Sequence, residues 1–316
     1  MDECRRAVDD CASNRYPRTL AGVLSNETER EHVVRMYFSR VHKRMDRVSR
    51  YYNYLQLLAQ TDSEILWSVL RRVRDRVAAE FAGEFVMVND FFSFRDASER
   101  LFPEWHQDNA FWMAGDDRCT GFNLWILLAA SDAEIAKSFE VYDVARERAF
   151  YEGLYAEHNP RLAGPLLSPR GWVDGKFDAS RARLRPGGPT REPLALGDAL
   201  VLRQLEIHRT DDDPLDAGHR RLALGFKFIE RDAALVEMPE PHFAFGHDLG
   251  TVRRKYPGLL GDLRVGAPFP DAYSNRSELA ALGSQLHDSP SPILALAGPV
   301  LSFGALIALS RRRRPS

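Results

Sequence analysis

The pattern of apolar residues changes from helical to strand-like near residue 85, and this change most restricts the folds open to the chain. Over residues 27–60 and 61–83, apolar side chains recur every three or four positions, which is the spacing of an amphipathic helix. Ser25 and Asn26 can cap the first helix, and Thr61 with Glu64 forms a capping box for the second. The first quarter of the chain is therefore predicted to be helical.

Five later segments predict β-strands because they are short, apolar and bounded by turn residues. They are residues 85–94, 121–129, 139–143, 198–207 and 221–229. A helical segment at 145–157 interrupts them, and the Pro-, Gly- and Arg-rich stretch 160–193 predicts a long excursion or lid. Helices followed by strands with irregular crossings are typical of an α+β fold, here a β-sandwich or barrel buttressed by helices.

Three regions follow from this pattern. Residues 1–84 are expected to form a helical region that packs on the core, residues 85–270 a β core with a lid insertion at about 144–193, and residues 271–316 a tail. The tail contains the apolar segment 293–309 followed by four arginines at 311–314. This segment is at the short end of the membrane-spanning range, and the arginines favour the cytosolic side. A peripheral membrane contact or a dispensable tail is therefore expected in preference to a spanning helix.

Charge and cysteine content exclude some classes of protein. A net charge of -2 gives no basic face for nucleic acid. The three cysteines, Cys4, Cys11 and Cys119, have no CxxC spacing, and the N-terminal residues lack the apolar stretch of a signal peptide. These features predict a cytoplasmic protein without a disulfide framework.

Two short segments carry candidate metal ligands. His106 and Asp108 are two residues apart, so in an extended segment both side chains point to the same side. By itself this pair is more typical of a surface turn than of a metal site. His208 follows the predicted strand 198–207 and would complete a set of two histidines and one carboxylate, which leaves metal positions open for O2 and a chelating cosubstrate. Arg220 opens the next strand and can pair with a carboxylate, and Thr210 can add a hydrogen bond.

The segments WHQDNAFW, NLWILLAASD, LGDALVLRQLEIHRT and GHRRLALGFKF resemble the phytanoyl-CoA dioxygenase-like family of Fe(II)/2-oxoglutarate oxygenases. The resemblance covers roughly residues 85–230 and implies a double-stranded β-helix, a jelly-roll fold, with flanking helices. It implies that His106, Asp108 and His208 bind Fe(II), and that Arg220 and Thr210 hold the distal carboxylate of 2-oxoglutarate. Asn89 and Ser93 lie at about the distance before His106 of polar residues that such enzymes direct at the cosubstrate.

The resemblance implies an O2-dependent hydroxylase, or another oxidase, of a small molecule in specialised metabolism. Halogenating relatives lack the carboxylate ligand, whereas Asp108 is present here. The chain departs from the family in the segment AKSFEVYDVARER, which lacks the usual Pro-Gly turn and histidine, so the substrate class stays open. Two alternatives remain: a non-catalytic jelly-roll binding or scaffold protein, and a zinc hydrolase that uses the same three ligands.

Overall fold

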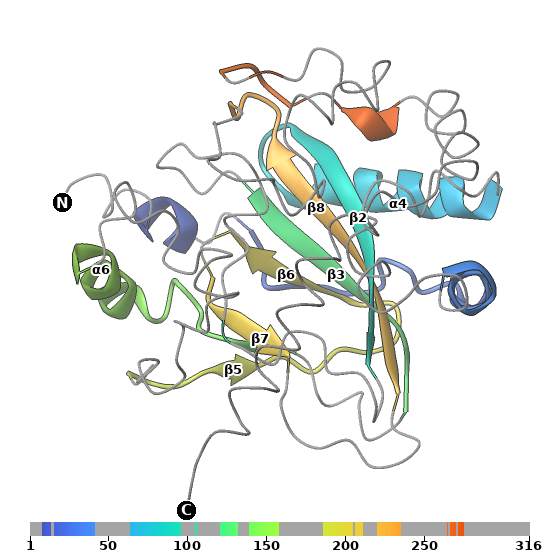
Figure 1. Cartoon of the computed structure of the whole chain (residues 1–316), viewed down its shortest axis with the longest axis horizontal. Helices are drawn as coiled ribbons and strands as arrows, with labels where there is room; N and C mark the ends of the chain where they lie inside the picture. Colours follow the sequence, from blue (N-terminus) through green and yellow to red (C-terminus); the bar gives the residue numbers. More distant parts are fainter. Residues whose placement is uncertain are drawn as a thin grey trace, which may run out of the picture.

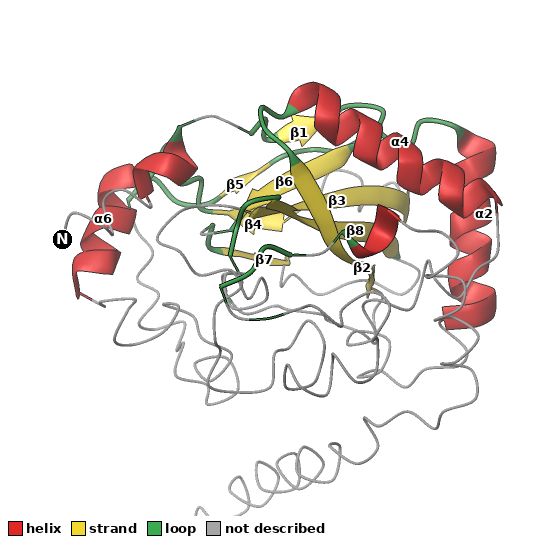
Figure 2. Ribbon diagram, turned by 90° about the horizontal axis from the view of Figure 1, so that it is seen from above, coloured by secondary structure: helices red, strands yellow, loops and turns green. Residues whose placement is uncertain are grey.

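The computed structural model describes residues 8–13, 16–41, 64–95, 105, 121–131, 139–157, 186–204, 206–210, 220–234, 264, 266–269 and 271–274. In this part of the chain, two antiparallel sheets share an interior, and two helices cover the outer side of the larger sheet (Figure 1, Figure 2). The expected α+β class, with helices packed on an antiparallel β core, is confirmed.

The first helix begins at its predicted cap. Helix α2 (Glu27–Met36) has Asn26 as its N-cap, and the Asn26 side-chain oxygen accepts a hydrogen bond from the Glu29 backbone N at 3.1 Å. The helix continues as a π-helical turn, η1 (Tyr37–Val41). Helix α4 (Glu64–Glu80) buries one apolar face, which includes Val69, Val73 and Val77. The predicted helical residues 42–60, and Thr61 of the capping box, lie outside the described residues.

The larger sheet has the strand order β1-β6-β3-β8-β2. These strands are β1 (Thr19–Leu20), β6 (Ala199–Arg203), β3 (Gly121–Ala130), β8 (Arg221–Glu230) and β2 (Phe85–Arg95). Four of them match predicted strands. The exception is β1, so the N-terminal region also contributes a strand. Strand β6 ends earlier than expected because the chain turns there, with the Glu206 backbone N donating to the Arg203 carbonyl at 3.0 Å.

The smaller sheet has the order β5-β4-β7. Strand β4 (Phe139–Val141) lies between β5 (Thr190–Arg191) and β7 (His208–Thr210). Helix α6 (Arg148–Glu157) follows β4. Strand β5 belongs to the predicted excursion, and the residues of that excursion before 186 lie outside the described part. The sequence analysis placed His208 just after a strand, whereas in the structure it begins one.

The two faces of the larger sheet have different neighbours. Leu224, Phe226 and Phe228 of β8 pack in one cluster with residues of α2 and α4. On the opposite face, Trp125 and Ala223 share a second cluster with Phe139 of the smaller sheet. Because residues alternate between faces along a strand, β8 presents a hydrophobic side to the helices and a mixed side to the interior between the sheets.

Two glycines allow close approaches that a side chain would block. Gly197, in the turn before β6, has a φ of +90°, and a Cβ there would lie 2.3 Å from the Leu24 carbonyl oxygen. Gly225 lies in the middle of β8, and a Cβ there would lie 2.2 Å from the Phe91 ring. The Phe91 ring therefore rests on the β8 backbone and fills the interior at this level.

The described residues bear on the expectations about cysteines and about membrane-spanning helices. Cys11 is disulfide-bonded, whereas the sequence analysis expected no disulfide framework, and the other two cysteines lie outside the described residues. No described helix has the length and apolar character needed to span a membrane, and the segment 293–309 lies outside the description.

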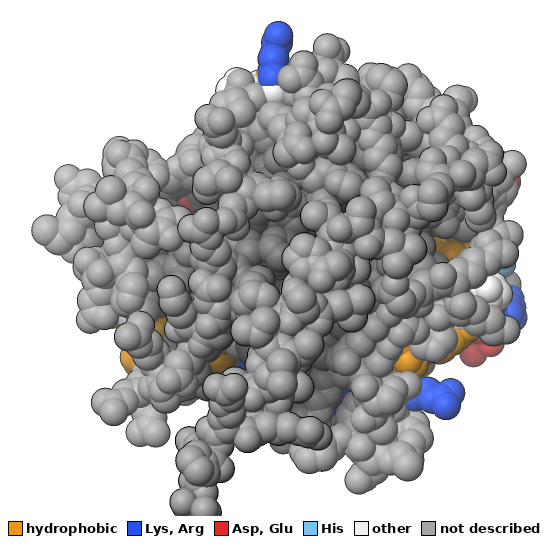
Figure 3. All heavy atoms as spheres, in the orientation of Figure 1, with side chains coloured by type: hydrophobic (Ala, Val, Ile, Leu, Met, Phe, Trp, Pro, Cys, Tyr) orange, Lys and Arg blue, Asp and Glu red, His pale blue; other side chains and the backbone are white. Residues whose placement is uncertain are grey.

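On the face in Figure 3, hydrophobic, basic and acidic side chains from the described residues are visible at the margins.

Candidate functional site

The structure describes the predicted site residues to different extents. His208 and Ser93 are described with their side chains. Asn89 and Thr210 are described only as positions in β2 and β7. His106 and Asp108 lie outside the described residues, so the predicted metal set cannot be seen together. Within the described ranges, no three metal-ligating side chains form a group.

His208 points into the interior between the two sheets. Its side chain is 2% exposed, and its ring lies edge-on to Phe139 with centroids 5.6 Å apart. Its Nδ1 lies 2.8 Å from the Glu206 carbonyl oxygen. Because a carbonyl can only accept, this contact assigns a proton to Nδ1, and in the neutral imidazole Nε2 then carries the lone pair. An imidazole fixed in this way is suited to bind a metal through Nε2.

The interior face of the larger sheet carries two buried arginines. Arg221 is 1% exposed, and it pairs across β2 and β8 with Arg95, which is 2% exposed. Ser93 pairs with Ala223 two residues further along and is also buried. The side chain of Arg220, by contrast, is exposed. Of the two neighbouring arginines Arg220 and Arg221, it is therefore Arg221 that lies on the interior face, one residue after the one that the sequence analysis selected.

Trp125 links Arg221 to the smaller sheet. The Arg221 guanidinium lies over the Trp125 ring, 5.2 Å from its centroid, and Phe139 meets the same ring edge-on at 5.0 Å. Trp125 is 1% exposed, and its Nε1 has no hydrogen-bond acceptor among the described residues. A buried N–H without an acceptor is costly. This donor beside a buried cation fits an anionic ligand, such as a carboxylate, in the interior.

On the outer side of the smaller sheet, the residue before His106 contacts the residue after His208. Arg209, which follows His208, donates to Glu140 at 2.5 Å, and its guanidinium lies 4.5 Å from the centroid of the Trp105 ring. Trp105, which precedes His106, also packs edge-on against Tyr142 at 5.0 Å. The chain just before His106 therefore lies against the strand that carries His208.

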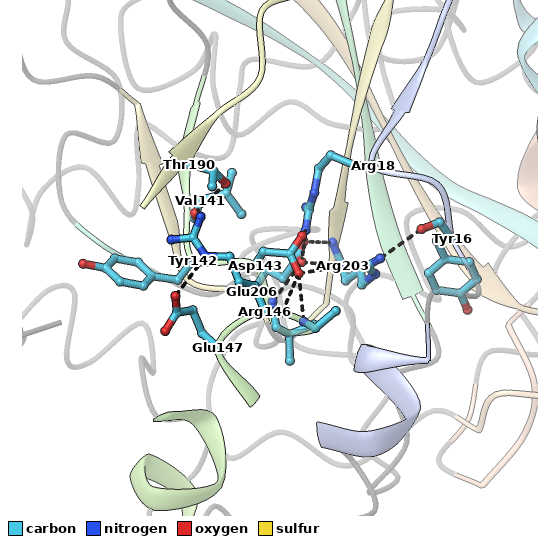
Figure 4. A network of polar contacts seen from close by, with 12 residues as sticks. Tyr16, Arg18, Val141, Tyr142, Asp143, Arg146, Glu147, Thr190, Arg203 and Glu206 are labelled. Atoms are coloured by element: carbon cyan, nitrogen blue, oxygen red, sulfur yellow. Dashed lines mark hydrogen bonds and ion pairs between the residues drawn. The ribbon is translucent and has the colours of Figure 1, made fainter. Parts of the chain in front are cut away.

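A buried ionic network adjoins His208. Figure 4 shows Arg18 and Arg203 pointing towards Glu206 and Asp143. Arg203 Nη1 donates to Glu206 at 2.9 Å, and Arg18 Nη1 donates to it at 2.5 Å. Arg18 Nη2 also donates to Asp143 at 2.5 Å. Two positive and two negative side chains thus balance one another.

The network holds both carboxylates in their charged form. Burial by itself would raise the pKa of Glu206, but the charge and hydrogen bonds of Arg18 and the charge of Arg203 outweigh it, so this pKa lies below its usual value. Burial and Arg18 act on Asp143 in the same opposing directions, and its pKa is lowered as well. The same two carboxylates outweigh the effect of burial on Arg18 and raise its pKa.

The sequence analysis preferred Arg220 to Arg221, and it gave no site role to Arg18 or Glu206. Arg221 lies on the same side of β8 as the odd-numbered positions Ala223 and Gly225, and only the structure shows that this side faces the interior. No sequence signal pairs Arg18 with Glu206, because 188 residues separate them and the contact depends on the pairing of β1 with β6.

The chain matches no protein-family model and no curated protein. Solved structures that resemble it include the non-heme alpha-ketoglutarate-dependent epimerase SnoN from nogalamycin biosynthesis, with a TM-score of 0.48 and 15% identity over 83% of this chain and 95% of that one. The non-heme monooxygenase ThoJ in complex with nickel has a TM-score of 0.45 and 14% identity over 87% and 97%. HygX from Streptomyces hygroscopicus, with nickel and 2-oxoglutarate bound, has a TM-score of 0.41 and 15% identity over 69% and 84%. With TM-scores below 0.5, these similarities carry no weight for the activity of this chain.

Proposed function

We propose that this protein is an Fe(II)/2-oxoglutarate-dependent oxygenase with a double-stranded β-helix core, and that it oxidises a small molecule. The observation that carries the proposal is the interior cluster in which Arg221 lies over Trp125, whose buried N–H lacks an acceptor among the described residues. Phe139 contacts both Trp125 and His208, so it connects this cluster to His208. A carboxylate site and a metal-binding imidazole thus face the same interior.

His208 binds Fe(II) through Nε2, together with His106 and Asp108. The packing of Trp105 beside Arg209 supports this set. Because neighbouring side chains alternate in an extended chain, we expect His106 and Asp108 to share the side opposite to Trp105. Two imidazoles and one carboxylate leave coordination positions for 2-oxoglutarate and O2.

Arg221 binds the distal carboxylate of 2-oxoglutarate, and the Trp125 indole donates a hydrogen bond to it. Arg95, which pairs with Arg221, increases the positive potential at this end of the interior. Thr210 and Ser93 are further candidates to support the cosubstrate, in the roles that the sequence resemblance implies. When bound, iron with 2-oxoglutarate and O2 supplies the oxidation, in which 2-oxoglutarate is converted to succinate and CO2. The protein orients both ligands and excludes water.

Succinate formation tests this function directly. Purified protein with Fe(II), 2-oxoglutarate and O2 should release succinate, at a rate that rises with an accepted substrate and falls to background when His208 is replaced by Ala. A zinc hydrolase would act on its substrate without 2-oxoglutarate. A binding or scaffold protein would release no succinate with any substrate in a broad screen.

A further inference from the structure

Glu206 lies two residues before His208 and is completely buried, although it carries a charge. Its carboxylate accepts hydrogen bonds from Arg18, from Arg203 Nη1 at 2.9 Å and from the Arg203 backbone N at 2.8 Å. Its backbone carbonyl is the group that accepts from His208 Nδ1. The side chain of Glu206 therefore fixes the same residue whose backbone sets the orientation of the imidazole.

Ile207, between Glu206 and His208, is held by a tyrosine hydroxyl. Its backbone N donates to the Tyr151 hydroxyl at 2.8 Å, and that hydroxyl donates to the Tyr142 carbonyl at 2.7 Å. The Ile207 carbonyl accepts from the Tyr142 backbone N at 2.9 Å. One hydroxyl thus ties the segment before His208 to the end of β4. The Tyr151 side chain is fully buried, so water cannot replace these bonds without a rearrangement.

Asp143 connects these two contacts. Its Oδ2 accepts from Arg18, and its Oδ1 accepts from the backbone N of Ala145 at 2.8 Å and of Arg146 at 3.2 Å. The last two bonds shape the turn that leads into α6, the helix that carries Tyr151. The ionic network therefore holds Glu206, and the Tyr151 hydroxyl holds Ile207. The turn that begins at Asp143 and leads into α6 connects these two contacts.

Stability alone is a weak explanation for a charge at this place. Burying a carboxylate carries a large desolvation penalty before its partners compensate, and a well-packed apolar group is often as stabilising. The pair of Arg74 with Asp271, on the far side of the larger sheet, incurs less of this cost because both side chains are partly exposed. Orientation of a metal-binding histidine is the kind of task that buried partners behind the ligand perform.

We propose that Glu206 and Tyr151 are positioning residues, which hold the segment 206–208 so that the Glu206 carbonyl receives the Nδ1 proton and His208 presents Nε2 to the interior. The consequence for metal binding rests on the proposed function, but the fixed state of the imidazole does not. The hydroxyl of Tyr151 and the carboxylate of Glu206 touch neither substrate nor metal in this account. They act through the backbone on either side of Ile207.

The test is done first on metal-free protein, by NMR of ¹⁵N-labelled histidines, with the His208 signals identified by their loss in His208→Gln. Wild type should show a single tautomer of His208 with the proton on Nδ1. Tyr151→Phe and Glu206→Gln should each give a mixture of tautomers. Asp271→Asn, which breaks the pair with Arg74, should lower stability slightly and leave the His208 signals unchanged.

Metal affinity is then measured by titration with Co(II), read from its visible absorption. Both positioning variants should bind Co(II) about 10- to 100-fold more weakly than wild type, the range typical of lost partners behind a ligand. The control should bind with the wild-type affinity. If Glu206→Gln does not fold, Tyr151→Phe decides, because it removes one oxygen and keeps the ring.

Two outcomes separate this inference from the proposed function. A single Nδ1–H tautomer that persists in the folded Tyr151→Phe protein would overturn the positioning role. If the tautomer is fixed in wild type and mixed in the variants, the positioning role is supported. If the wild-type protein then binds no Co(II), the metal site is overturned.

Discussion

Replacing Arg221 and Arg220 separately gives a sharp comparison, because the two cations are adjacent in sequence and opposite in environment. Arg221 is 1% exposed beside Trp125, whereas Arg220 is exposed. Truncating one member of a buried charge pair costs about 2–5 kcal/mol, while an exposed pair contributes roughly 0.2–1 kcal/mol. Arg221→Ala should therefore weaken 2-oxoglutarate binding by about 30-fold to several thousand-fold. Arg220→Ala should weaken it by less than about tenfold.

The assay is anaerobic binding of 2-oxoglutarate to the Fe(II) protein, with thermal unfolding of each metal-free variant as the control for folding. Arg221→Lys should recover only part of the affinity, because an ammonium cannot form the planar pair of hydrogen bonds that a guanidinium makes with a carboxylate. Wild-type affinity in a folded Arg221→Ala protein would refute the reasoning. A large loss in Arg220→Ala alone would restore the residue selected from the sequence.

Three further predictions concern the interior and the ionic network. Trp125→Phe removes the indole donor and keeps an aromatic ring. The affinity for 2-oxoglutarate should fall roughly tenfold or more, as for a lost hydrogen bond to a charged group. An unchanged dissociation constant would show that this donor faces no carboxylate. Gly225→Ala places a methyl group against the Phe91 ring and should lower the free energy of unfolding by about 1–3 kcal/mol in urea titrations, and equal stability would mean that the ring moves aside freely. The pKa of Asp143 is lower in the folded than in the unfolded chain, so its charge stabilises the protein above its ordinary pKa and loses this effect as pH falls through the folded value. The stability difference between wild type and Asp143→Asn should thus be largest near neutral pH and shrink below about pH 4, and a difference that grows in acid would contradict the network described here.

Local signals in the sequence predicted much of the fold. The cap at Asn26 and the long strands β2, β3 and β8 were placed to within one residue of their observed ends, because each depends on patterns within a few residues. The short strands β1 and β5 were missed, since two residues carry no periodicity. They form only because a partner strand lies beside them.

The candidate site divides in the same way. His208 was selected because a histidine beside a strand is visible in the sequence, and its side chain is buried in the structure. Arg220 and Arg221 are neighbours, so their side chains point to opposite sides of β8. The sequence does not show which side faces the interior, because a shift of one residue exchanges the two sides. The network of Arg18 with Glu206 was invisible, because charges far apart in the chain become partners only through the tertiary fold.

The central claim is that His106, Asp108 and His208 together bind Fe(II) in a form that accepts 2-oxoglutarate. The most direct measurement is an anaerobic titration of the protein with Fe(II) and 2-oxoglutarate, followed by the weak visible charge-transfer absorption of the chelate. Wild type should develop this band with one equivalent of each, and the Ala variants at residues 106, 108 and 208 should not, while their far-UV circular dichroism remains that of wild type. A band of full intensity in folded His208→Ala, or none in wild type, would contradict the account.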